Sequence, residues 1–535
     1  MPPVVPDLLT ATAARQGERP ALVMDDLMVT YAELEMASNR VARSLIRYGV
    51  RRGDRVALWI PKSMKAIVAL WGVMKAGATY VPVDAAAPAS RLAYVARQCD
   101  ISALVTPAAR APELDAAFGG QMPMRGVWYT DSTGDAQPLA GVPAIPWREL
   151  ESESTERPDV AMDEDDLAHI VYTSGSTGEP KGAMATHRIL LAFVKWADDT
   201  FKVTYEDRVP GHSAINHGLS GFELFLAVHA GATVYPVSPR IAVFPTAVAK
   251  SWSEQRLTIW YVMSSILTSM LNRGNLAACD LSSLRLVVFC GEAFPAKHLR
   301  QLMKLAPQAR FVALYGRTET KVNMMYEGRS LPEDDAPLPL GKPCAGFRAL
   351  VLDESERPVR DGEVGELWLS GPTLMRGYWG LPELTAQTLK SIEVDPGVSL
   401  LACRTGDLVK RHEDGNLEFR GRVDHQVKVR GHRVELGEIE FALTGHAAVE
   451  RAVVLALPQE DVGHRLKAAV IVKPGLAIDE IALKRHCATN LPTYMVPETI
   501  ELHSSLPLTS NGKVDRPVLL RQMTSASPRT AKTGR

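Results

Sequence analysis

Three glycines, four serine or threonine hydroxyls and one lysine occur within eleven residues of this chain, in the run "YTSGSTGEPKG" from Tyr172 to Gly182. Glycine can adopt positive φ angles and turn neighbouring backbone N–H groups toward one concavity, while hydroxyls and a lysine add donors. Such a set of donors suits a cluster of anionic oxygens, most often a phosphate chain. A flexible surface turn is the alternative interpretation.

The flanking residues indicate which elements would position this run. It follows the apolar stretch "LAHIVYT" and leads into the helical pattern "HRILLAFVKWADDTF". We therefore expect a strand, loop and helix arrangement that aims backbone N–H groups at phosphate. The Walker A pattern G-x-x-x-x-G-K-[ST] is absent, because Lys181 stands before a glycine and not after one. An ordinary P-loop NTPase is disfavoured.

Composition narrows the class of protein. The chain has 535 residues, 46% of them apolar, so it can bury large cores, and its length predicts about three or four domain-sized units. The formal net charge of -1 provides no basic field, so neither nucleic acid nor an anionic membrane is the expected partner. A small-molecule substrate is favoured.

The cysteines indicate whether a metal site or a disulfide framework is expected, and the N-terminal residues indicate the expected cellular compartment. The six cysteines form no C-x-x-C pair and have no histidines at metal spacing, which argues against a zinc site and a disulfide framework. The N-terminus lacks a basic and then apolar signal, and no uncharged apolar run reaches about 18 residues. We expect a cytoplasmic enzyme.

Apolar runs of strand length alternate with helical periodicity over much of the chain, the pattern of β-α-β units and parallel sheets. The first such series covers residues 55–107 and the second starts at residue 166 and continues to residue 293. Residues 119–159, rich in Pro, Gly, Ser and acidic residues, are interpreted as a loose surface excursion. Short strands with turn residues from Leu338 indicate a β-rich lobe, and a small α/β unit follows "GRVDHQVKVRGHR".

Six segments resemble, in this order, the motifs of the adenylate-forming superfamily: "YTSGSTGEPKG", "LYGRTET", "GELWLSG", "CRTGDLVK", "GRVDHQVKVRGHRVELGEIE" and "LPLTSNGKVDR". The likeness is greatest to amino acid adenylation domains of nonribosomal peptide synthetases, with acyl-CoA synthetases and luciferases as more distant relatives. It implies an α/β fold: a large N-terminal domain of two α/β sheet subdomains plus a β-rich lobe, and a small mobile α+β C-terminal domain. The expected bounds are 1–423 for the core, 424–520 for the lid and 521–535 for a polar tail.

The resemblance implies attack of a carboxylate on the α-phosphorus of ATP, with Mg²⁺ present, to give an acyl-adenylate and pyrophosphate. Positioning and cations accelerate such a reaction. It implies catalytic roles for Lys513, Thr318 and Glu319, with Glu319 also binding the metal and Lys513 bridging the carboxylate and the α-phosphate. It implies cofactor-binding roles for Ser174, Gly175, Ser176, Thr177, Gly178, Lys181, Gly291, Glu292, Ala293, Tyr315, Gly316, Asp407, Arg422 and Lys428.

Within that set, Tyr315 would stack near adenine, Asp407 would accept hydrogen bonds from the ribose diol, and Arg422 would assist it. Asp424 would be the hinge about which the lid swings between two reactions, and Lys428 and Gly431 would face the second one. Each residue type also has a plain structural alternative: a core aromatic for Tyr315, a surface acid for Glu319, and turn residues for Asp407 and Lys513.

The acyl pocket departs from the family pattern. Where amino acid adenylation domains usually carry a Phe-Asp pair whose Asp grips the α-ammonium, this chain has His217 and Gly218. Gly218 cannot pair with a cation, and an unpaired buried ammonium would cost several kcal/mol. We therefore expect an acid other than an α-amino acid, either a β- or ω-amino acid or an acid without an amine. The His-Gly pair resembles the acyl and aryl branches, where a histidine approaches the substrate carboxylate.

The remaining pocket positions implied by the family are mostly apolar. Tyr261, Asn323 and Glu223 are the polar candidates, although Glu223 has a structural role as its alternative. Arg317 replaces the usual proline of "YGPTE", as an extra cation or a surface replacement, and Cys403 replaces a common tyrosine. The implied pocket residues are His217, Gly218, Leu219, Phe222, Tyr261, Val288, Cys290, Leu314, Val322 and Asn323.

The sequence also bears on the acceptor. Only 22 residues follow Lys513, too few for a carrier module, so we expect a stand-alone enzyme that loads the phosphopantetheine thiol of a separate acyl or peptidyl carrier protein. Coenzyme A is the alternative acceptor. A non-catalytic adenylate-binding protein and a light-emitting oxygenase remain as further hypotheses.

Overall fold

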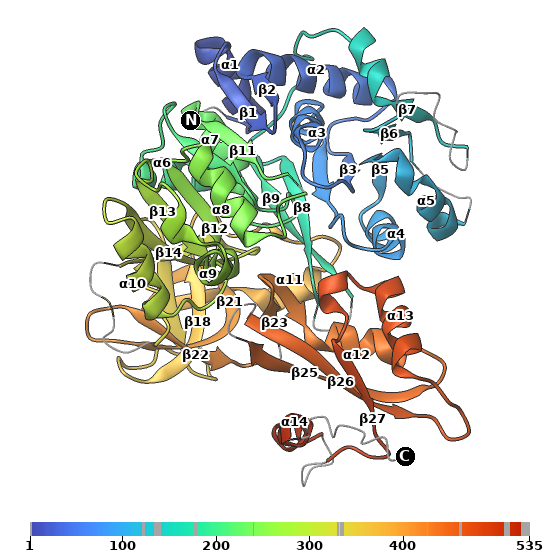
Figure 1. Ribbon diagram of the computed structural model, residues 1–535, viewed down its shortest axis with the longest axis vertical. Coiled ribbons are helices and arrows are strands. Elements are labelled where there is room, and N and C mark those ends of the chain that lie inside the picture. Colours follow the sequence, from blue (N-terminus) through green and yellow to red (C-terminus); the bar gives the residue numbers. More distant parts are fainter. Residues whose placement is uncertain are drawn as a thin grey trace. The chain divides into compact units, whose positions relative to one another are not determined.

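The computed structural model describes residues 3–119, 124–132, 141–175, 179–238, 240–328, 331, 336–424, 426–459, 463–507 and 514–525 (Figure 1). It divides into two compact units, one formed by residues 1–173 and 180–424 and the other by residues 174–179 and 425–535.

The largest sheet of the first unit has the strand order β19-β9-β8-β4-β3-β5-β6-β7. Figure 1 labels β9, β8, β3, β5, β6 and β7 of this sheet. Its strands are β3 (Arg55–Leu58), β4 (Thr79–Pro82), β5 (Ile101–Thr106), β6 (Val127–Tyr129), β7 (Ala144–Pro146), β8 (Leu167–Thr173), β9 (Lys181–Thr186) and β19 (Gly377–Tyr378). The strands from β8 across to β7 pair in parallel, whereas β9 and β19 extend the sheet antiparallel.

Helices cover both faces of this sheet. Successive residues of its strands point to opposite sides, so neighbouring residues pack against different helices. Ala57 and Leu104 pack in one hydrophobic cluster with α4 (Ala89–Gln98) and α5 (Ala111–Phe118). Their neighbours Val56, Leu58 and Val105 pack in another cluster with α1 (Pro6–Gln16), α2 (Tyr31–Arg47), α3 (Met64–Lys75) and α6 (His187–Phe201).

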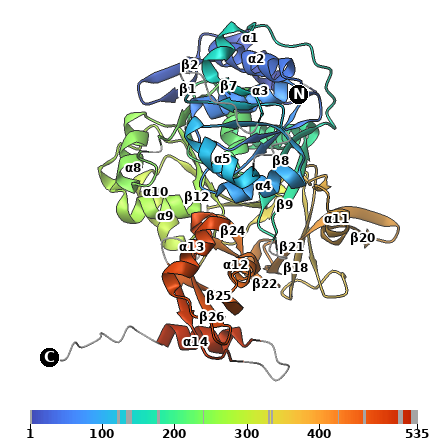
Figure 2. The same ribbon diagram turned by 90° about the vertical axis from the view of Figure 1, so that its right-hand side faces the viewer.

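A second sheet has the order β12-β13-β14-β15-β16. Its strands are β12 (Ile259–Met263), β13 (Leu286–Cys290), β14 (Arg310–Arg317), β15 (Lys321–Glu327) and β16 (Lys342–Pro343), of which β12, β13 and β14 are parallel. One face packs against α8 (Pro245–Glu254), α9 (Ser264–Arg273) and α10 (Ala296–Leu305), which Figure 2 shows beside β12. The other face, with Tyr261, Val288 and Leu314, joins the cluster around α3 and α6.

Two smaller sheets complete the first unit. One has the order β10-β11-β1-β2, formed by β1 (Pro20–Met24), β2 (Leu27–Thr30), β10 (Arg208–Gly211) and β11 (Thr233–Pro236). The other is an antiparallel sheet of β17 (Arg348–Leu352), β18 (Val364–Ser370), β21 (Val398–Arg411) and β20 (Leu389–Asp395), with β22 (Leu417–Arg422) paired to β21 and α11 (Pro382–Thr388) before β20. This sheet is the β-rich lobe expected from the sequence.

The second unit contains a hairpin and a three-stranded sheet. The hairpin of β23 (Gln426–Val429) and β24 (His432–Glu435) turns at Arg430 and Gly431, which both have positive φ, as a two-residue hairpin turn requires. The sheet β25-β26-β27 packs with α12 and α13. These elements are α12 (Leu436–Thr444), β25 (Val449–Gln459), β26 (Gly463–Val472), α13 (Glu480–Asn490) and β27 (Thr499–Leu502), and α14 (Arg516–Ser525) follows them.

Two expectations from the sequence were wrong. Residues 119–159 are not only a loose excursion, because β6 and β7 extend the large sheet and Val127 and Trp128 are fully buried. Strands of three residues are too short to show periodicity, and the pairing of β6 with β5 and of β7 with β6 is what makes them strands. The glycine-rich run does not lead directly into a helix either: it joins β8 to the antiparallel strand β9, and α6 begins only at His187.

The six cysteines are free thiols, as the sequence indicated. Among the helices that the structure describes, none is long and apolar enough to cross a membrane.

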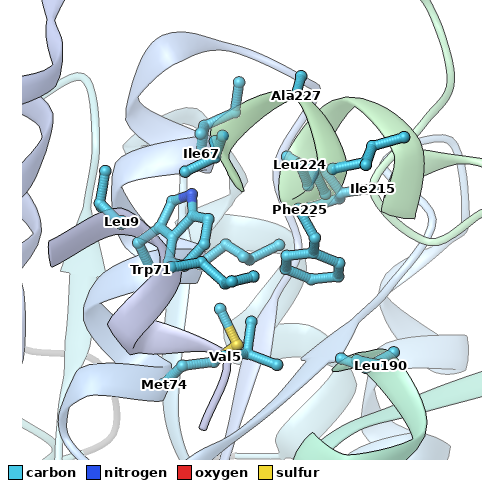
Figure 3. Close-up of a cluster of buried hydrophobic side chains, with 14 of the residues drawn as sticks. Val5, Leu9, Ile67, Trp71, Met74, Leu190, Ile215, Leu224, Phe225 and Ala227 are labelled. Atoms are coloured by element: carbon cyan, nitrogen blue, oxygen red, sulfur yellow. The ribbon is translucent and has the colours of Figure 1, made fainter. Parts of the chain in front are cut away.

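Trp71 of α3 is a fully buried residue of the largest hydrophobic cluster (Figure 3). Its ring meets the ring of Phe225 edge to face, with the centroids 5.8 Å apart. The neighbouring Gly72 lets α3 approach α2 closely: an added Cβ would lie 2.5 Å from the Val41 side chain and 2.9 Å from the backbone oxygen of Ser38.

We expect Gly72→Ala to lower the free energy of unfolding by about 1–3 kcal/mol, because the added methyl group meets backbone that cannot move aside without separating the helices. Urea unfolding of the purified protein measures this. Met36→Ala, at a half-exposed position of α2, is the matched control and should change the free energy by less than about 0.5 kcal/mol. Equal effects of the two variants would contradict the close approach of the helices.

Candidate active site

The carboxyl ends of the parallel strands β12, β13 and β14 bring most of the predicted pocket residues together. Tyr261 pairs with Val288, and two residues further along Cys290 pairs with Leu314, so all four side chains share one face. The aromatic rings of Phe222 and Tyr261 stack with centroids 4.2 Å apart. Leu219, Phe222, Tyr261, Val288, Leu314 and Val322 are buried in one cluster, and Cys290 packs against it.

Asn323 stands out in this apolar lining. Its side chain is fully buried on β15, and neither its amide oxygen nor its amide nitrogen has a hydrogen-bond partner within the described part of the chain. An unsatisfied buried amide group costs about 1–3 kcal/mol. A polar group of a bound molecule would remove that cost, so Asn323 suits recognition of a ligand.

Asp407 and its partners form the first half of a buried polar cluster. Asp407 on β21 lies directly opposite Arg422 on β22, whose guanidinium binds one carboxylate oxygen, while the hydroxyl of Tyr315 donates to the other. Arg422 also binds both oxygens of Asp424 at 2.6 Å. A carboxylate can accept about four hydrogen bonds, so two sites on Asp407 remain for the hydroxyls of a diol.

Glu319 forms the second half of the cluster. Only 1% of its side chain is exposed, the hydroxyl of Tyr378 donates to it at 2.8 Å, and Nε of Arg317 lies 3.6 Å from it. The ammonium of Lys181 lies over the Tyr378 ring, 4.9 Å from its centroid. Sequence reasoning did not identify Tyr378, although its position in "RGYWG", after the motif "GELWLSG", was the available signal.

Arg317 is a buried cation and not a surface replacement. Its side chain is 10% exposed, and the charges of Glu319 and Asp407 outweigh burial and raise its pKa above the usual value. Its Nη1 atom is buried and has no hydrogen-bond partner among the described residues. A buried guanidinium nitrogen with an unused N–H donor can bind an anionic oxygen.

Backbone geometry fixes the loops that carry the other predicted residues. Thr318 and Glu319 lie in the turn between β14 and β15, and an added Cβ at Gly316 would lie 1.8 Å from the backbone oxygen of Lys321. The turn therefore needs glycine at position 316. After β13, the hydroxyl of Ser264 lies 3.2 Å from the oxygen of Cys290 and 3.1 Å from that of Glu292, and Gly291 between them has positive φ. Ala293 continues this loop.

The metal-ligating chemistry of these residues is limited. Within the described residues, no group of three or more His, Cys, Asp or Glu side chains could hold a metal ion. Mg²⁺ is commonly bound through one or two carboxylates together with substrate phosphates and waters. The buried carboxylate of Glu319 fits a site of that kind.

A small cavity adjoins the pocket and has room for about one water-sized group, about 10 Å³. His217 and Gly218 line it together with Lys321, His169 and Tyr80. The ammonium of Lys321 lies 2.9 Å from Nε2 of His169, and the hydroxyl of Tyr80 lies 2.7 Å from Nδ1 of the same ring. Burial lowers the pKa of His169 well below its usual range, and burial also lowers the pKa of Lys321 to about 8 although the charge of Glu319 raises it. Sequence reasoning did not identify Lys321.

Glu223 is not a free polar handle. It lies in the short helical segment Phe222–Leu226 and forms a salt bridge with Lys62, with the two side chains only 3% and 9% exposed. Lys62 also donates to the backbone oxygen of Ser213 at 2.9 Å. Burial raises the pKa of Glu223 and lowers that of Lys62. The pairing supports the structural alternative for Glu223.

Several predicted site residues lie outside the described residues, and others belong to the second unit. Ser176, Thr177, Gly178 and Lys513 lie outside the described residues. Ser174, Gly175, Lys428 and Gly431 belong to the second unit, where the backbone oxygen of Lys428 accepts a hydrogen bond from His464 at 3.0 Å. Cys403 is fully buried.

Comparison with protein families gives two matches. Residues 9–379 match the family model described as AMP-binding enzyme, and residues 438–513 match the one described as AMP-binding enzyme C-terminal domain. These matches confirm the resemblance to the adenylate-forming superfamily.

Two relatives match along nearly their whole length. Over 513 residues the chain is 37% identical to the L-proline–[L-prolyl-carrier protein] ligase of Streptomyces coelicolor, covering 94% of each chain. It is 35% identical to the ligase of the same name from Pseudomonas fluorescens, covering 95% of this chain and 97% of that one.

Solved structures confirm the α/β fold class. The adenylation domain AlmE of Vibrio cholerae aligns with a TM-score of 0.84 at 23% identity, covering 98% of both chains. The amide bond synthetase McbA from Marinactinospora thermotolerans aligns with a TM-score of 0.83 at 24% identity, covering 96% of this chain and 99% of that one.

We expect Lys62→Met to lower the free energy of unfolding by about 3–5 kcal/mol, because it leaves the Glu223 carboxylate buried without a cation. Chemical denaturation measures this. The double variant Lys62→Met/Glu223→Met removes both charges and should recover most of the loss. If the double variant is no more stable than Lys62→Met, the salt bridge is not the reason for the loss.

Proposed function

The chain belongs to the AMP-binding enzyme family, and on that premise we propose that it activates a carboxylic acid with ATP and loads the acyl group onto a separate carrier protein. It is an AMP-forming acid–thiol ligase. In the first step the acid attacks the α-phosphorus of ATP, forming an acyl-adenylate and releasing pyrophosphate. In the second, the phosphopantetheine thiol of the carrier attacks the acyl carbon and AMP leaves.

The observation that carries this proposal is a polar cluster of two buried carboxylates, each paired with an arginine: Glu319 with Arg317 and Asp407 with Arg422. Asp407 has hydrogen-bonding capacity left for a ribose diol, and the Tyr315 ring beside it offers a flat surface to a base. The buried nitrogen of Arg317 that lacks a partner would bind a phosphate oxygen. Together these groups match the parts of a bound ATP.

The chemistry at the α-phosphorus needs charge neutralisation. Mg²⁺, when bound at Glu319, would neutralise charge on the phosphate oxygens. Thr318 would donate to an α-phosphate oxygen, and the glycine-rich run with Lys181 would hold the leaving pyrophosphate. Lys513 would bridge the substrate carboxylate and the α-phosphate in the transition state, where their repulsion is greatest.

The second unit would act as a lid in this scheme. We assign residues 1–423 to the core, 424–520 to the lid and 521–535 to a tail. Asp424 would be the hinge, and it is the last residue of the first compact unit. In the second reaction Lys428 and Gly431 would lie near the incoming thiol arm.

Carrier-protein loading is favoured over coenzyme A because two relatives that match over nearly their full length are named carrier protein ligases. Those relatives are named for L-proline. Gly218 argues against such an α-amino or imino acid here, since it offers no carboxylate to the nitrogen. We propose a β- or ω-amino acid or an acid without an amine, with Asn323 as a polar contact in an otherwise apolar pocket.

The first experiment measures pyrophosphate release with hydroxylamine trapping of the adenylate, over α-amino acids including L-proline, β-amino, ω-amino, 2-hydroxy, 2-oxo, aryl and fatty acids. We expect signal from acids without an α-amine. A strong α-amino acid or L-proline signal would mean that another group binds the nitrogen. Silence on every acid would support a non-catalytic adenylate-binding protein.

Lys513→Ala should lower the rate of adenylate formation by about 100-fold or more, while the dissociation constant for ATP changes little, because the lysine acts on the transition state. Lys473→Ala, at an exposed lysine of the same unit, is the control. Equal losses of ATP binding and of rate in Lys513→Ala would contradict the transition-state role.

A further inference from the structure

The cavity beside Gly218 is lined by hydrogen-bond donors. Lys321, His217 and Tyr80 contribute polar groups to it, and the described residues around it include no carboxylate. Apolar walls come from Leu190, Ile215 and Phe225, which Figure 3 shows on three different segments of the chain. A space of this kind accepts a small group that receives hydrogen bonds and repels a cation.

The hydrogen-bond network fixes which groups donate. If the Lys321 ammonium donates to Nε2 of His169, the ring must carry its proton on Nδ1 and donate it to the Tyr80 oxygen. Lys321 then has two further N–H groups. Its hydrogen-bond partner is a ring nitrogen and not a carboxylate.

His217 also lines the cavity. Its Nδ1 atom accepts a hydrogen bond from the backbone N–H of Leu219 at 3.3 Å. The cavity has room for about one water-sized group, which matches a single oxygen atom with its hydrogen.

Gly218 leaves this space open. A Cβ built at Gly218 meets no heavy atom within 4 Å, so the position could hold a side chain but does not. Where a carboxylate at this position would attract an ammonium, the chain instead has an open position beside a lysine. A lysine and a substrate ammonium both donate hydrogen bonds, so this place does not suit an amine.

We propose that this cavity is a subsite for one oxygen of the acid substrate, and that the substrate is a 2-hydroxy or 2-oxo acid whose oxygen occupies the place of the α-amine. This inference rests on the proposed acid activation. It makes Lys321 a specificity-determining residue, with His169 and Tyr80 positioning its ammonium. A second carboxylate offers the same acceptor chemistry but has two oxygens, so the size of the space favours the single oxygen.

The test compares matched sets of acids with the same side chain and a 2-oxo, 2-hydroxy, 2-amino or unsubstituted carbon, together with short dicarboxylic acids. Hydroxamate formation gives kcat/KM for each. We expect the 2-oxo or 2-hydroxy acid to exceed the unsubstituted and amino acids by about 100-fold or more, as for sites built to bind a substrate oxygen. A preference for dicarboxylic acids would overturn the single-oxygen assignment, and a preference for unsubstituted or amino acids would overturn the subsite.

Variants separate specificity from stability. Lys321→Met should reduce the preference for the oxygen-bearing acid over its unsubstituted counterpart to less than about 5-fold, and Lys321→Arg should retain part of it. The double variant Gly218→Asp/Lys321→Met should raise kcat/KM for the 2-amino acid by about 10-fold or more. Lys195→Met, at an exposed lysine of α6, is the matched control. Equal losses on both acids in Lys321→Met would show a purely structural role and overturn the proposal.

A binding measurement distinguishes this inference from the proposed function. Without ATP, the 2-oxo or 2-hydroxy acid should raise the Tm of the wild-type protein and not that of Lys321→Met. Binding that depends on Lys321 without adenylate formation would support the subsite and reject the proposed activity. Adenylate formation with other acids, without such binding, would support the activity and reject the subsite.

Discussion

The buried charges at the end of β14 are the constraint on which the site depends. Glu319 and Asp407 are almost inaccessible, and each is held by an arginine and a tyrosine, Arg317 with Tyr378 and Arg422 with Tyr315. A buried carboxylate without such partners would be strongly destabilising. The second sheet, the β-rich lobe and β19 must therefore meet at one place, because each supplies part of the cluster.

The two faces of the second sheet have different tasks. One face is covered by α8, α9 and α10, and its apolar side chains pack against those helices. The other faces the hydrophobic cluster that contains Trp71, where Phe222 and Tyr261 stack and the candidate pocket lies. Because strands alternate side chains between faces, Tyr261, Val288 and Leu314 reach the pocket while Trp260, Val287 and Phe289 anchor the helices. Rigid packing on one face thus positions the residues on the other.

Two lysines near the pocket show how environment decides what a cation can do. Lys62 is bound to Glu223, so that pair is electrically neutral and contributes to packing. Lys321 contacts the neutral ring of His169 and lines a cavity. The same side-chain chemistry therefore has a structural role at one position and is available to a ligand at the other.

Much of this protein was determined by its sequence alone. Periodicity indicated β3, α3, β4, α4, β12, β13 and the C-terminal elements, because long runs with a regular pattern reflect burial directly, and the ordered motifs identified the family. Tertiary structure alone decided the rest. The short strands β6 and β7, the pairing of β9 with β8, the Lys62–Glu223 salt bridge and the place of Lys321 beside His169 all depend on contacts between residues far apart in the chain. No local pattern encodes such contacts, since hydrogen bonding and charge pairing act between neighbours in space and not in sequence.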